Sequence, residues 1–393
     1  MRDEGDEPAA ELREARAAFR RRDWRRAWEG YSSVATTDPG ALTTDDLSNS
    51  ADAAWWLGLP DESMKLGESA YRRFLTEERP HAAAHAALGV ATSLLLRGEY
   101  AAGSGWLSRA ARLLADVPEC ADQGYLRYLM EVEGELDGPD LDGVVAAARD
   151  IQLLGRRFED PTLVAIGILG EGRALIRLGQ VDAGMAALDE AMVAVLADDI
   201  APEWAGNIYC HLIAACHELA DLRRAQEWLA ITERWLHTMP VAAVFTGICR
   251  VHRSQFLAVK GEWERAEAEA RRVLSDVGHI HLASVAEAHY TLGEIFRKRG
   301  DLAAAGAAYR VAHESGLDPQ PGQALLLLAM GKVDAALASI RTALTAQAHN
   351  PLARARLCAA QVEIAAAAGD LAAAAEACTE LEQTAAEFNS TGL

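Results

Sequence analysis

The sequence predicts an all-α fold, a right-handed superhelix (an α-solenoid) of about ten helix hairpins with a period near 40 residues. Three observations predict it. The chain has 393 residues, is rich in alanine, and only 6% of its residues are aromatic, a composition that favours helices. Apolar residues recur at intervals of three and four along most of its length. Glycine-containing turns interrupt these runs at regular distances.

The stretch 286–319 shows the repeated unit most clearly. Gly300 separates two runs of helical spacing, which predicts a helix, a tight turn and a second helix. Gly293 and Ala305 are small where the two antiparallel helices approach each other. The large apolar residues beside them are Leu292, Phe296 and Tyr309. One such hairpin cannot bury its apolar face alone, so it needs a copy on each side.

The sequence supplies these copies. Equivalent turns occur at Arg22, Gly58, Gly98, Asp137, Gly179, Ala220, Gly261, Gly331 and Gly369. Six of the intervals between turns span 38 to 41 residues, and a small residue follows most turns five positions later. This is the tetratricopeptide pattern in a version with long helices. We therefore expect one repeat domain over residues 11–393, preceded by a disordered acidic N-terminus over residues 1–10.

One interval is shorter than the others. Only 31 residues separate Gly300 from Gly331. The prolines of the segment 318–322 (DPQPG) stop one helix, and the next has room for about two turns. We interpret this as a shortened hairpin that bends the superhelix. A ligand-shaped opening at the bend is the alternative.

Composition and charge exclude several classes of protein. The net charge of −20 repels phosphate backbones, so we expect no direct binding of nucleic acid. Cationic, apolar or neutral partners fit better. No apolar run approaches the ~20 residues of a membrane span, and the N-terminus has no signal-peptide pattern. The six cysteines form no CxxC pair, which favours reduced core thiols in a cytoplasmic protein.

Motifs of catalysis are missing from the sequence. Nothing matches a phosphate-binding loop, and no nucleophile or carboxylate pair can be argued from spacing. Two fragments of a dinucleotide fingerprint, at residues 103–105 and 170–172, lie inside expected helices, where close helix packing explains their glycines. We therefore predict a protein that is not an enzyme and that uses no cofactor.

Histidines and cysteines give weak metal signals. His81 and His85 share a helix face but have no third ligand nearby in the sequence. Cys210 and His217 also share a face, with His211 and Cys216 between them. A core cysteine beside a surface histidine is our interpretation, with a metal as the lesser alternative. We predict no metal site.

A basic cluster flanks the first turn, with two tryptophans interleaved. Its members are Arg20, Arg21, Arg22, Arg25 and Arg26, with Trp24 and Trp28. Arginine near the C-terminus of a helix is favoured by the helix dipole. We interpret the cluster as a solvated terminal cap, and a docking surface for another domain is the alternative.

The stretch 247–256 is unusual for the core of a repeat. By register with 286–319, Arg250 and Arg253 fall on or near the packed face, where charges are costly unless paired. Our hypothesis joins them and His252 to the next repeat in a network that lines the concave groove. The network is either a staple between layers or a site that captures an anionic or polar ligand. The predicted ligand- or partner-binding residues are Arg173, Asn207, Arg250, His252, Arg253, Gln255, Glu287, Tyr290, Glu294 and Arg297.

Several strings resemble a known family. Residues 249–274 (CRVHRSQFLAVKGEWERAEAEARRVL), 286–305 (AEAHYTLGEIFRKRGDLAAA) and 313–340 (HESGLDPQPGQALLLLAMGKVDAALASI) are similar to the tetratricopeptide sensor region of bacterial LuxR-type transcriptional regulators. Residues 15–31 and 94–114 resemble the same region. The resemblance implies signal reception and self-association, with a possible homo-oligomer. In that family a DNA-binding helix-turn-helix follows the repeats, and we expect none within this chain.

These observations together predict a regulatory or sensor module that is not an enzyme. It binds a small ligand or a protein partner in the concave groove, as part or relative of a LuxR-type regulator. Because each layer contacts only its neighbours, small rotations add up along the superhelix and can carry a signal. The alternative is a stand-alone scaffold that binds an extended peptide or a partner protein. Asn207, Gln255 and Arg297 do not form the lysine/asparagine clamp of chaperone-binding grooves.

Overall fold

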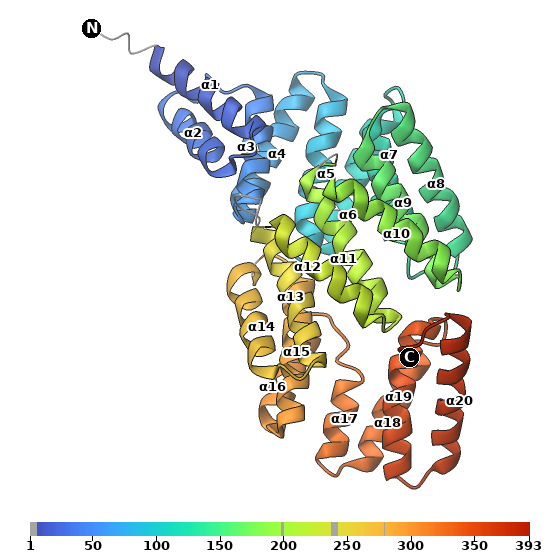
Figure 1. The fold of residues 1–393 in the computed structure, drawn as a ribbon. Coiled ribbons are helices and arrows are strands. Elements are labelled where there is room, and N and C mark those ends of the chain that lie inside the picture. The colour runs from blue at the N-terminus through green and yellow to red at the C-terminus, as the bar shows by residue number, and fades with distance from the viewer. Residues whose placement is uncertain (1–5, 198–199, 237–242, 279) are drawn as a thin grey trace. The chain divides into compact units, whose positions relative to one another are not determined.

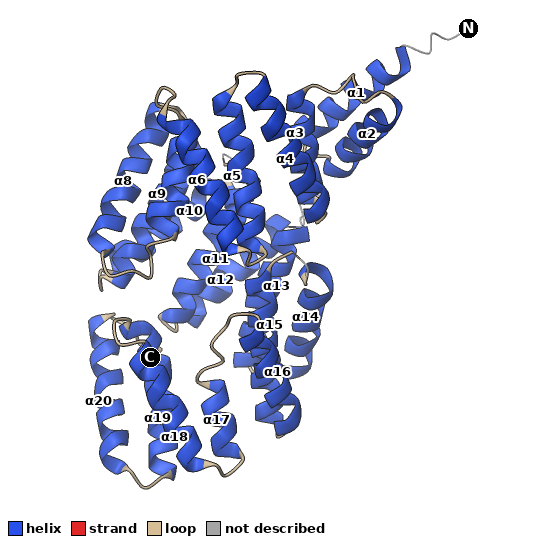
Figure 2. Cartoon of the chain, turned by 180° about the vertical axis from the view of Figure 1, so that it is seen from behind, coloured by secondary structure: helices blue, strands red, loops and turns tan. Residues whose placement is uncertain are grey.

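The fold is all-α, as the sequence predicts. A computed structural model describes residues 6–197, 200–236, 243–278 and 280–393. Within these ranges every regular element is a helix, and no strand occurs (Figure 1, Figure 2). None of the helices described there is long and apolar enough to cross a membrane.

Successive helices form hairpins, in the order expected. The bounds are α1 Asp6–Arg20, α2 Trp24–Thr37, α3 Thr44–Trp56, α4 Pro60–Thr76, α5 Pro80–Leu96, α6 Tyr100–Ala115, α7 Ala121–Arg127 with the π-helix η1 Tyr128–Glu133, α8 Leu141–Arg157, α9 Pro161–Arg177, α10 Val181–Leu196, α11 Pro202–Glu218, α12 Leu222–Leu236, α13 Ala243–Val259, α14 Trp263–Val277, α15 Leu282–Arg299, α16 Leu302–Glu314, α17 Gly322–Ala329, α18 Val333–Ala346, α19 Pro351–Ala367 and α20 Leu371–Glu387. Helix α1 begins at Asp6, inside the segment 1–10 for which the sequence predicts disorder.

The predicted turns are where the chain reverses. Nine of the ten have a residue with positive φ, and in the seven turns where that residue is glycine the angle runs from 73° at Gly58 to 85° at Gly300. Glycine adopts this left-handed conformation without strain because it has no Cβ. Arg22 (φ 60°) and Ala220 (φ 51°) adopt it as well, at a cost that glycine would not have. The tenth turn, after Asp137, differs because it follows η1.

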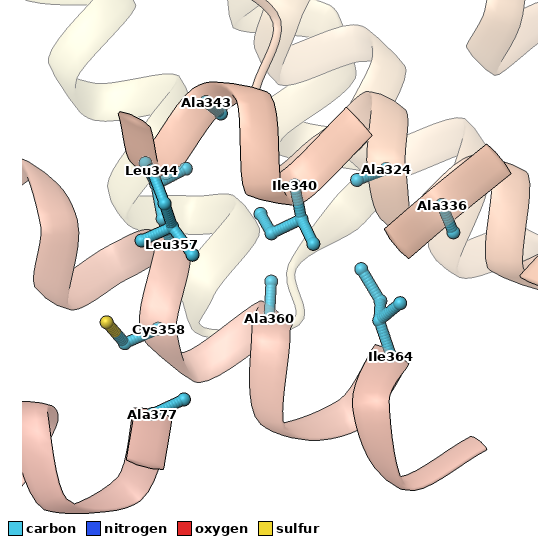
Figure 3. Packing of buried hydrophobic residues seen from close by; sticks show 10 residues of the cluster. All are labelled: Ala324, Ala336, Ile340, Ala343, Leu344, Leu357, Cys358, Ala360, Ile364 and Ala377. Carbon is cyan, nitrogen blue, oxygen red and sulfur yellow. The ribbon is translucent and has the colours of Figure 1, made fainter. Parts of the chain in front are cut away.

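Small residues lie where the paired helices touch. Ala27, Ala225, Ala266, Ala305 and Ala336, each five positions after a turn, are 0% exposed. Figure 3 shows Ala336 with Ile340 in the core formed by α17, α18, α19 and α20. This pattern confirms the tetratricopeptide-like packing inferred from the sequence.

The close approach at Gly293 is against an aromatic ring rather than against Ala305. A Cβ added at Gly293 would lie 2.5 Å from the Tyr309 ring. The glycines of the two fingerprint fragments also serve packing at Gly103, Gly170 and Gly172, where an added Cβ would lie within 3 Å of a neighbour. For Gly105 that interpretation is wrong, because nothing lies within 4 Å of its added Cβ.

The short interval contains a short hairpin. Helix α17 has 8 residues, which confirms the two turns expected before Gly331. A shallow depression at the bend is lined by Asp318, Gln320 and residues of α18. The Gln320 amide reaches across it and donates to Ser339 Oγ at 2.8 Å.

Contacts divide the chain into two compact units, which are described separately. Unit 1 comprises residues 1–126, 234–247 and 276–282, and unit 2 comprises 127–233, 248–275 and 283–393. Within unit 2 the C-terminal tail returns to a much earlier hairpin. Ser390 Oγ donates to the Leu219 carbonyl at 2.6 Å, across 171 residues. The expectation that each layer contacts only its neighbours is therefore wrong at this end of unit 2.

Candidate binding surface

Polar side chains of unit 2 gather on the first helices of successive hairpins and on η1. We call this set the polar band. Its members are Tyr128, Glu133, Arg173, Asn207, His211, His217, Glu218, His252, Gln255, Glu287, Tyr290 and Arg356. They come from η1, α9, α11, α13, α15 and α19.

The band begins at the π-helical turn η1. A π-turn displaces side chains relative to a regular helix and is frequent at functional sites. Here the Tyr128 hydroxyl donates to Asn207 Oδ1 at 3.0 Å, and Glu133 Oε1 lies 3.2 Å from His211 Nε2. Burial alone would raise the pKa of Glu133, but His211, Tyr128 and Arg173 lower that pKa to about 2. Glu133, whose side chain is 37% exposed, is therefore a carboxylate rather than a carboxylic acid at neutral pH.

Helix α9 contributes a buried arginine. Arg173 is 3% exposed, and its Nη1 and Nη2 donate to the two oxygens of Glu218 at 3.0 and 2.9 Å. Arg177 shares Glu218 at 3.4 Å and also pairs with Asp137 at 2.9 Å. Paired guanidinium and carboxylate groups fix the orientation of both helices because the geometry is bidentate. The pair therefore holds α9 and α11 in register.

A chain of neutral and acidic groups joins α11, α13 and α15. The rings of His217 and His252 are 6.0 Å apart. His252 Nδ1 lies 3.4 Å from Gln255 Oε1, and Gln255 Nε2 donates to Glu287 Oε2 at 2.8 Å. The amide thus links an imidazole of its own helix to a carboxylate of the next hairpin.

The positive charge of Arg356 in α19 affects the pKa values of groups in the same region. Its side chain is exposed, and it makes no ion pair with any residue in the described ranges. Burial lowers the pKa of His217 to about 4, the Arg356 cation adds to this, and Glu218 opposes it. Burial raises the pKa of Glu287, whereas Arg356 and Gln255 act against that shift. Burial likewise raises the pKa of Tyr290, again opposed by Arg356.

The structure brings together only part of the predicted network. His252, Gln255, Glu287 and Tyr290 lie in one region, and Arg173 and Asn207 belong to the same band. The expected pairing of the two arginines of α13 with the carboxylates of α15 is wrong. Arg250 pairs with Glu269 of α14 at 3.8 Å, and Arg253 pairs with Glu233 of α12 at 2.9 Å.

Those arginines are only partly buried, with side-chain exposures of 30% and 39%. The register with 286–319 placed them near the packed face. Their partners are carboxylates on second helices instead. Arg250 contacts α14 of its own hairpin, and Arg253 contacts α12 of the preceding hairpin. The residues 241–248 just before them lie outside the side chains that the structure describes.

Glu294 and Arg297 form a separate group on α15. Arg297 donates to both oxygens of Glu294, at 3.2 and 2.8 Å, and the Tyr309 hydroxyl donates to the same carboxylate. Burial alone would raise the pKa of Glu294, but Arg297 and Tyr309 lower it. The Tyr290 ring, 5.8 Å from the Tyr309 ring, connects this group to the polar band.

Six members of the band were missed by the sequence analysis. They are Tyr128, Glu133, His211, His217, Glu218 and Arg356. Arg173 and Glu218 are 45 residues apart, and Tyr128 and Asn207 are 79 apart, about one and two periods. A search for complementary polar residues at those separations would have found these pairs, whereas nothing in the sequence announces the π-turn.

The cysteines of α11 and α13 are structural. Burial raises the pKa of the Cys216 thiol to about 12, and it raises the pKa values of Cys210 and Cys249 as well. Thiols with raised pKa values are poor nucleophiles and poor metal ligands. His211 and His217 meanwhile face Glu133 and His252.

In the basic cluster near the N-terminus, a tryptophan is buried in the core, whereas two of the arginines form ion pairs around it. Trp24 is 7% exposed and stacks on Trp56, with ring centroids 5.4 Å apart. Arg21 and Arg26 pair with Glu14 at 2.8 and 3.5 Å. An aromatic core with paired arginines around it agrees with a terminal cap.

Comparison with known proteins identifies the fold but no family. No family model matches the chain, and no curated protein matches it. Among solved structures, a Rap protein complexed with competence and sporulation factor superposes with a TM-score of 0.60 at 11% identity, over 88% of this chain and 98% of that one. The apo form of RapI (TM-score 0.38, 12% identity, 79% and 97% covered) and yeast Tom70 (0.37, 14%, 99% and 94%) are weaker matches, from which we draw no argument.

The first of these likenesses agrees with the helix order, the turns and the buried small residues described above. The chain therefore has a tetratricopeptide-like helical repeat fold.

Proposed function

We propose that this chain is a receptor module that is not an enzyme, and that its polar band binds a short peptide or an extended polypeptide segment. The observation that carries the proposal is that a carboxyl group and a guanidinium lie in one region of unit 2 but do not form an ion pair with each other. Glu287 is hydrogen-bonded to Gln255, and the exposed Arg356 has no ion pair among the described residues. A ligand that offers both an amine and a carboxylate would complement the two.

The groups between these charges suit a polypeptide backbone. Asn207 and Gln255 have amides that both donate and accept hydrogen bonds. His217, with its pKa lowered to about 4, is neutral at pH 7 and can do the same. Backbone amides of an extended segment need donors and acceptors of this kind, because burying them unpaired is costly.

The fold supports the same class of function. A Rap protein of this fold was solved in complex with competence and sporulation factor, and we propose that a factor binds here as well. The resemblance of residues 249–274, 286–305 and 313–340 to the sensor region of LuxR-type regulators supports a role in the control of transcription, in the cytoplasm. We propose that the chain acts as part or relative of such a regulator, with self-association as one output.

Binding would act through the spacing of the hairpins. The band takes side chains from α11, α13, α15 and α19, so a ligand that contacts all four helices spans four hairpin junctions at once. In a repeat protein, small rotations at successive junctions add. The ligand stabilises the spacing to which it binds best.

The test is native mass spectrometry of the full chain purified from its own host, followed by the Arg356→Ala variant. We expect a retained mass of peptide size that is lost in Arg356→Ala. Arg310→Ala is the matched control, because Arg310 is also exposed and lies in unit 2, but on a second helix, α16.

The outcomes separate the candidate functions. A retained mass that Arg356→Ala and Arg310→Ala both keep would contradict the proposed site. A retained folded protein in place of a peptide would favour the stand-alone scaffold. A chain that carries no mass from its host and binds no member of a random peptide library would overturn the proposal.

A further inference from the structure

We propose that unit 1 contains a zinc-type metal site formed by His81, Cys120 and Asp122, with His85 as a supporting residue. One nitrogen of His81, the thiol sulfur of Cys120 and one carboxylate oxygen of Asp122 all lie within 4.8 Å of one another. No third ligand lies near His81 and His85 in the sequence, and the fold brings Cys120 and Asp122 to them from the next hairpin. The site is unrelated to the polar band of unit 2.

The repeat geometry explains how these residues meet. His81 and His85 occupy the first two turns of α5, four residues apart and so on one face. Cys120 directly precedes α7, the first helix of the next hairpin, and Asp122 lies in its first turn. First helices of successive hairpins are neighbours in this fold, so residues about one period apart come together.

Asp122 is the residue that needs an explanation. It is 6% exposed, and its ion-pair partners among the described residues are two imidazoles. His81 Nε2 lies 2.7 Å from Oδ2, and His85 Nδ1 lies 2.9 Å from Oδ1. No arginine or lysine in the described ranges pairs with it, whereas buried charges in proteins are usually paired with an opposite charge or coordinate a metal. A divalent metal held by His81, Cys120 and Asp122 would supply a positive charge at this carboxylate.

The ligand set selects the class of metal. One imidazole, one thiolate and one carboxylate are ligands of Zn²⁺, whereas Mg²⁺ and Ca²⁺ prefer oxygen alone. Ligand atoms around a tetrahedral zinc ion are about 3.3 to 3.8 Å apart, so the three atoms need to move by little more than an ångström. The exposed His81 side chain, at 58%, has room to do so.

His85 completes the arrangement in a supporting position. Its Nδ1 contacts the carboxylate oxygen that faces away from His81, and a hydrogen bond of this kind orients a ligating carboxylate. A metal bound in this way ties α5 to the start of α7 and so clamps two hairpins of unit 1. Water occupies the fourth position in a site with three protein ligands.

The experiment titrates the full chain, stripped with a chelator and kept reduced, with Zn²⁺ by isothermal calorimetry and with Co²⁺ by absorption. We expect one saturable site per chain and, for Co²⁺, the charge-transfer band of a thiolate ligand. His81→Ala and Cys120→Ser should each weaken Zn²⁺ binding by at least about tenfold. Cys120→Ser should also abolish the thiolate band.

Two variants outside the proposed site serve as matched controls. His349→Ala and Cys378→Ser remove an exposed histidine and an exposed cysteine of unit 2, and both should bind Zn²⁺ like the parent chain. His81 and Cys120 are not buried, so their variants should keep the parent circular-dichroism spectrum and melting temperature without metal. Absence of a saturable site, or equal affinity in His81→Ala and His349→Ala, would overturn the assignment.

Discussion

Two arginine–carboxylate pairs of this protein have the same geometry and very different surroundings. In unit 1, Arg79 donates two hydrogen bonds to Asp45 at 2.9 and 2.8 Å. In unit 2, Arg173 donates two to Glu218 at 3.0 and 2.9 Å. The side chains of the first pair are 42% and 59% exposed, and those of the second are 4% and 26% exposed. The contact distance therefore says little about how much each pair contributes to the free energy of unfolding.

The difference shows how unit 2 depends on its polar band. Water screens an exposed pair and competes for its hydrogen bonds, so the net contribution is small. A buried pair has lost that water, and each charge depends on the other. Apolar residues of the same size would often stabilise the fold equally well, so we infer that the buried pair serves to fix the orientation of α9 and α11.

The largest expected effect is the removal of Glu218. Glu218→Ala leaves the Arg173 guanidinium, 3% exposed, without its carboxylate and should lower the free energy of unfolding by about 3–5 kcal/mol. Urea denaturation followed by circular dichroism measures it.

The control for this prediction removes both charges. Arg173→Met with Glu218→Leu restores an uncharged, packed contact and should recover most of the lost stability. A single variant that unfolds at the parent urea concentration would show that the pair is not buried as described.

The next largest effect concerns Gly293. A Cβ there would lie 2.5 to 3.0 Å from three atoms of the Tyr309 ring, and that ring is 1% exposed. Gly293→Ala should therefore destabilise unit 2 by about 2 kcal/mol through overpacking, despite the better helix propensity of alanine. In Gly306→Ala the nearest atom is 3.5 Å away, so that variant should be neutral or more stable by up to about 1 kcal/mol. Equal melting temperatures for the two variants would contradict this packing.

The same packing explains why the fold could be predicted from the sequence. A turn such as Gly300, a small residue such as Ala305 and a large one such as Tyr309 are local signals that recur with the period. Local signals of this kind determine a repeat fold because each hairpin packs mainly on its neighbours. The contact between the C-terminal tail and Leu219 has no local signal in the sequence. It depends on the sum of small rotations between successive hairpins of unit 2.

The candidate site was less predictable for a related reason. Gln255 and Glu287 are 32 residues apart, and the register with 286–319 put the stretch 247–256 beside the helix of Glu287 without pairing these two residues. The same register gave Arg250 and Arg253 the wrong partners, because long side chains can reach either neighbouring helix and the sequence does not say which. For the metal site proposed around Asp122, the three candidate ligands are split between two hairpins and leave no recognisable motif in either one.

A smaller effect should appear in the dependence of stability on pH. Burial lowers the pKa of His217 to about 4 from its ordinary 6.5, so the unfolded chain binds a proton at His217 before the folded chain does. The resulting stability is fully present above pH 6.5 and is lost as the pH falls towards 4. We expect the parent chain to lose roughly 1–2 kcal/mol from this residue over that range.

Denaturant titrations at pH 7 and pH 4.5 measure that loss. His217→Gln should flatten the slope of stability against pH, whereas His349→Gln, at an exposed histidine, should leave it unchanged. His281, whose pKa burial also lowers to about 4, keeps part of the slope in both variants. A slope that His217→Gln does not alter would show that His217 is accessible to protons in the folded state.

The smallest effect returns to the exposed pair. Asp45→Asn removes the carboxylate partner of Arg79 but leaves both groups in water, so the free energy of unfolding should fall by less than about 1 kcal/mol. Because exposed charges are screened by salt, even this loss should shrink when the urea titration is repeated in 1 M NaCl. Glu218→Ala should keep most of its loss in the same salt, since ions do not reach a buried guanidinium. A loss for Asp45→Asn as large and as salt-resistant as that of Glu218→Ala would remove the distinction between the two pairs.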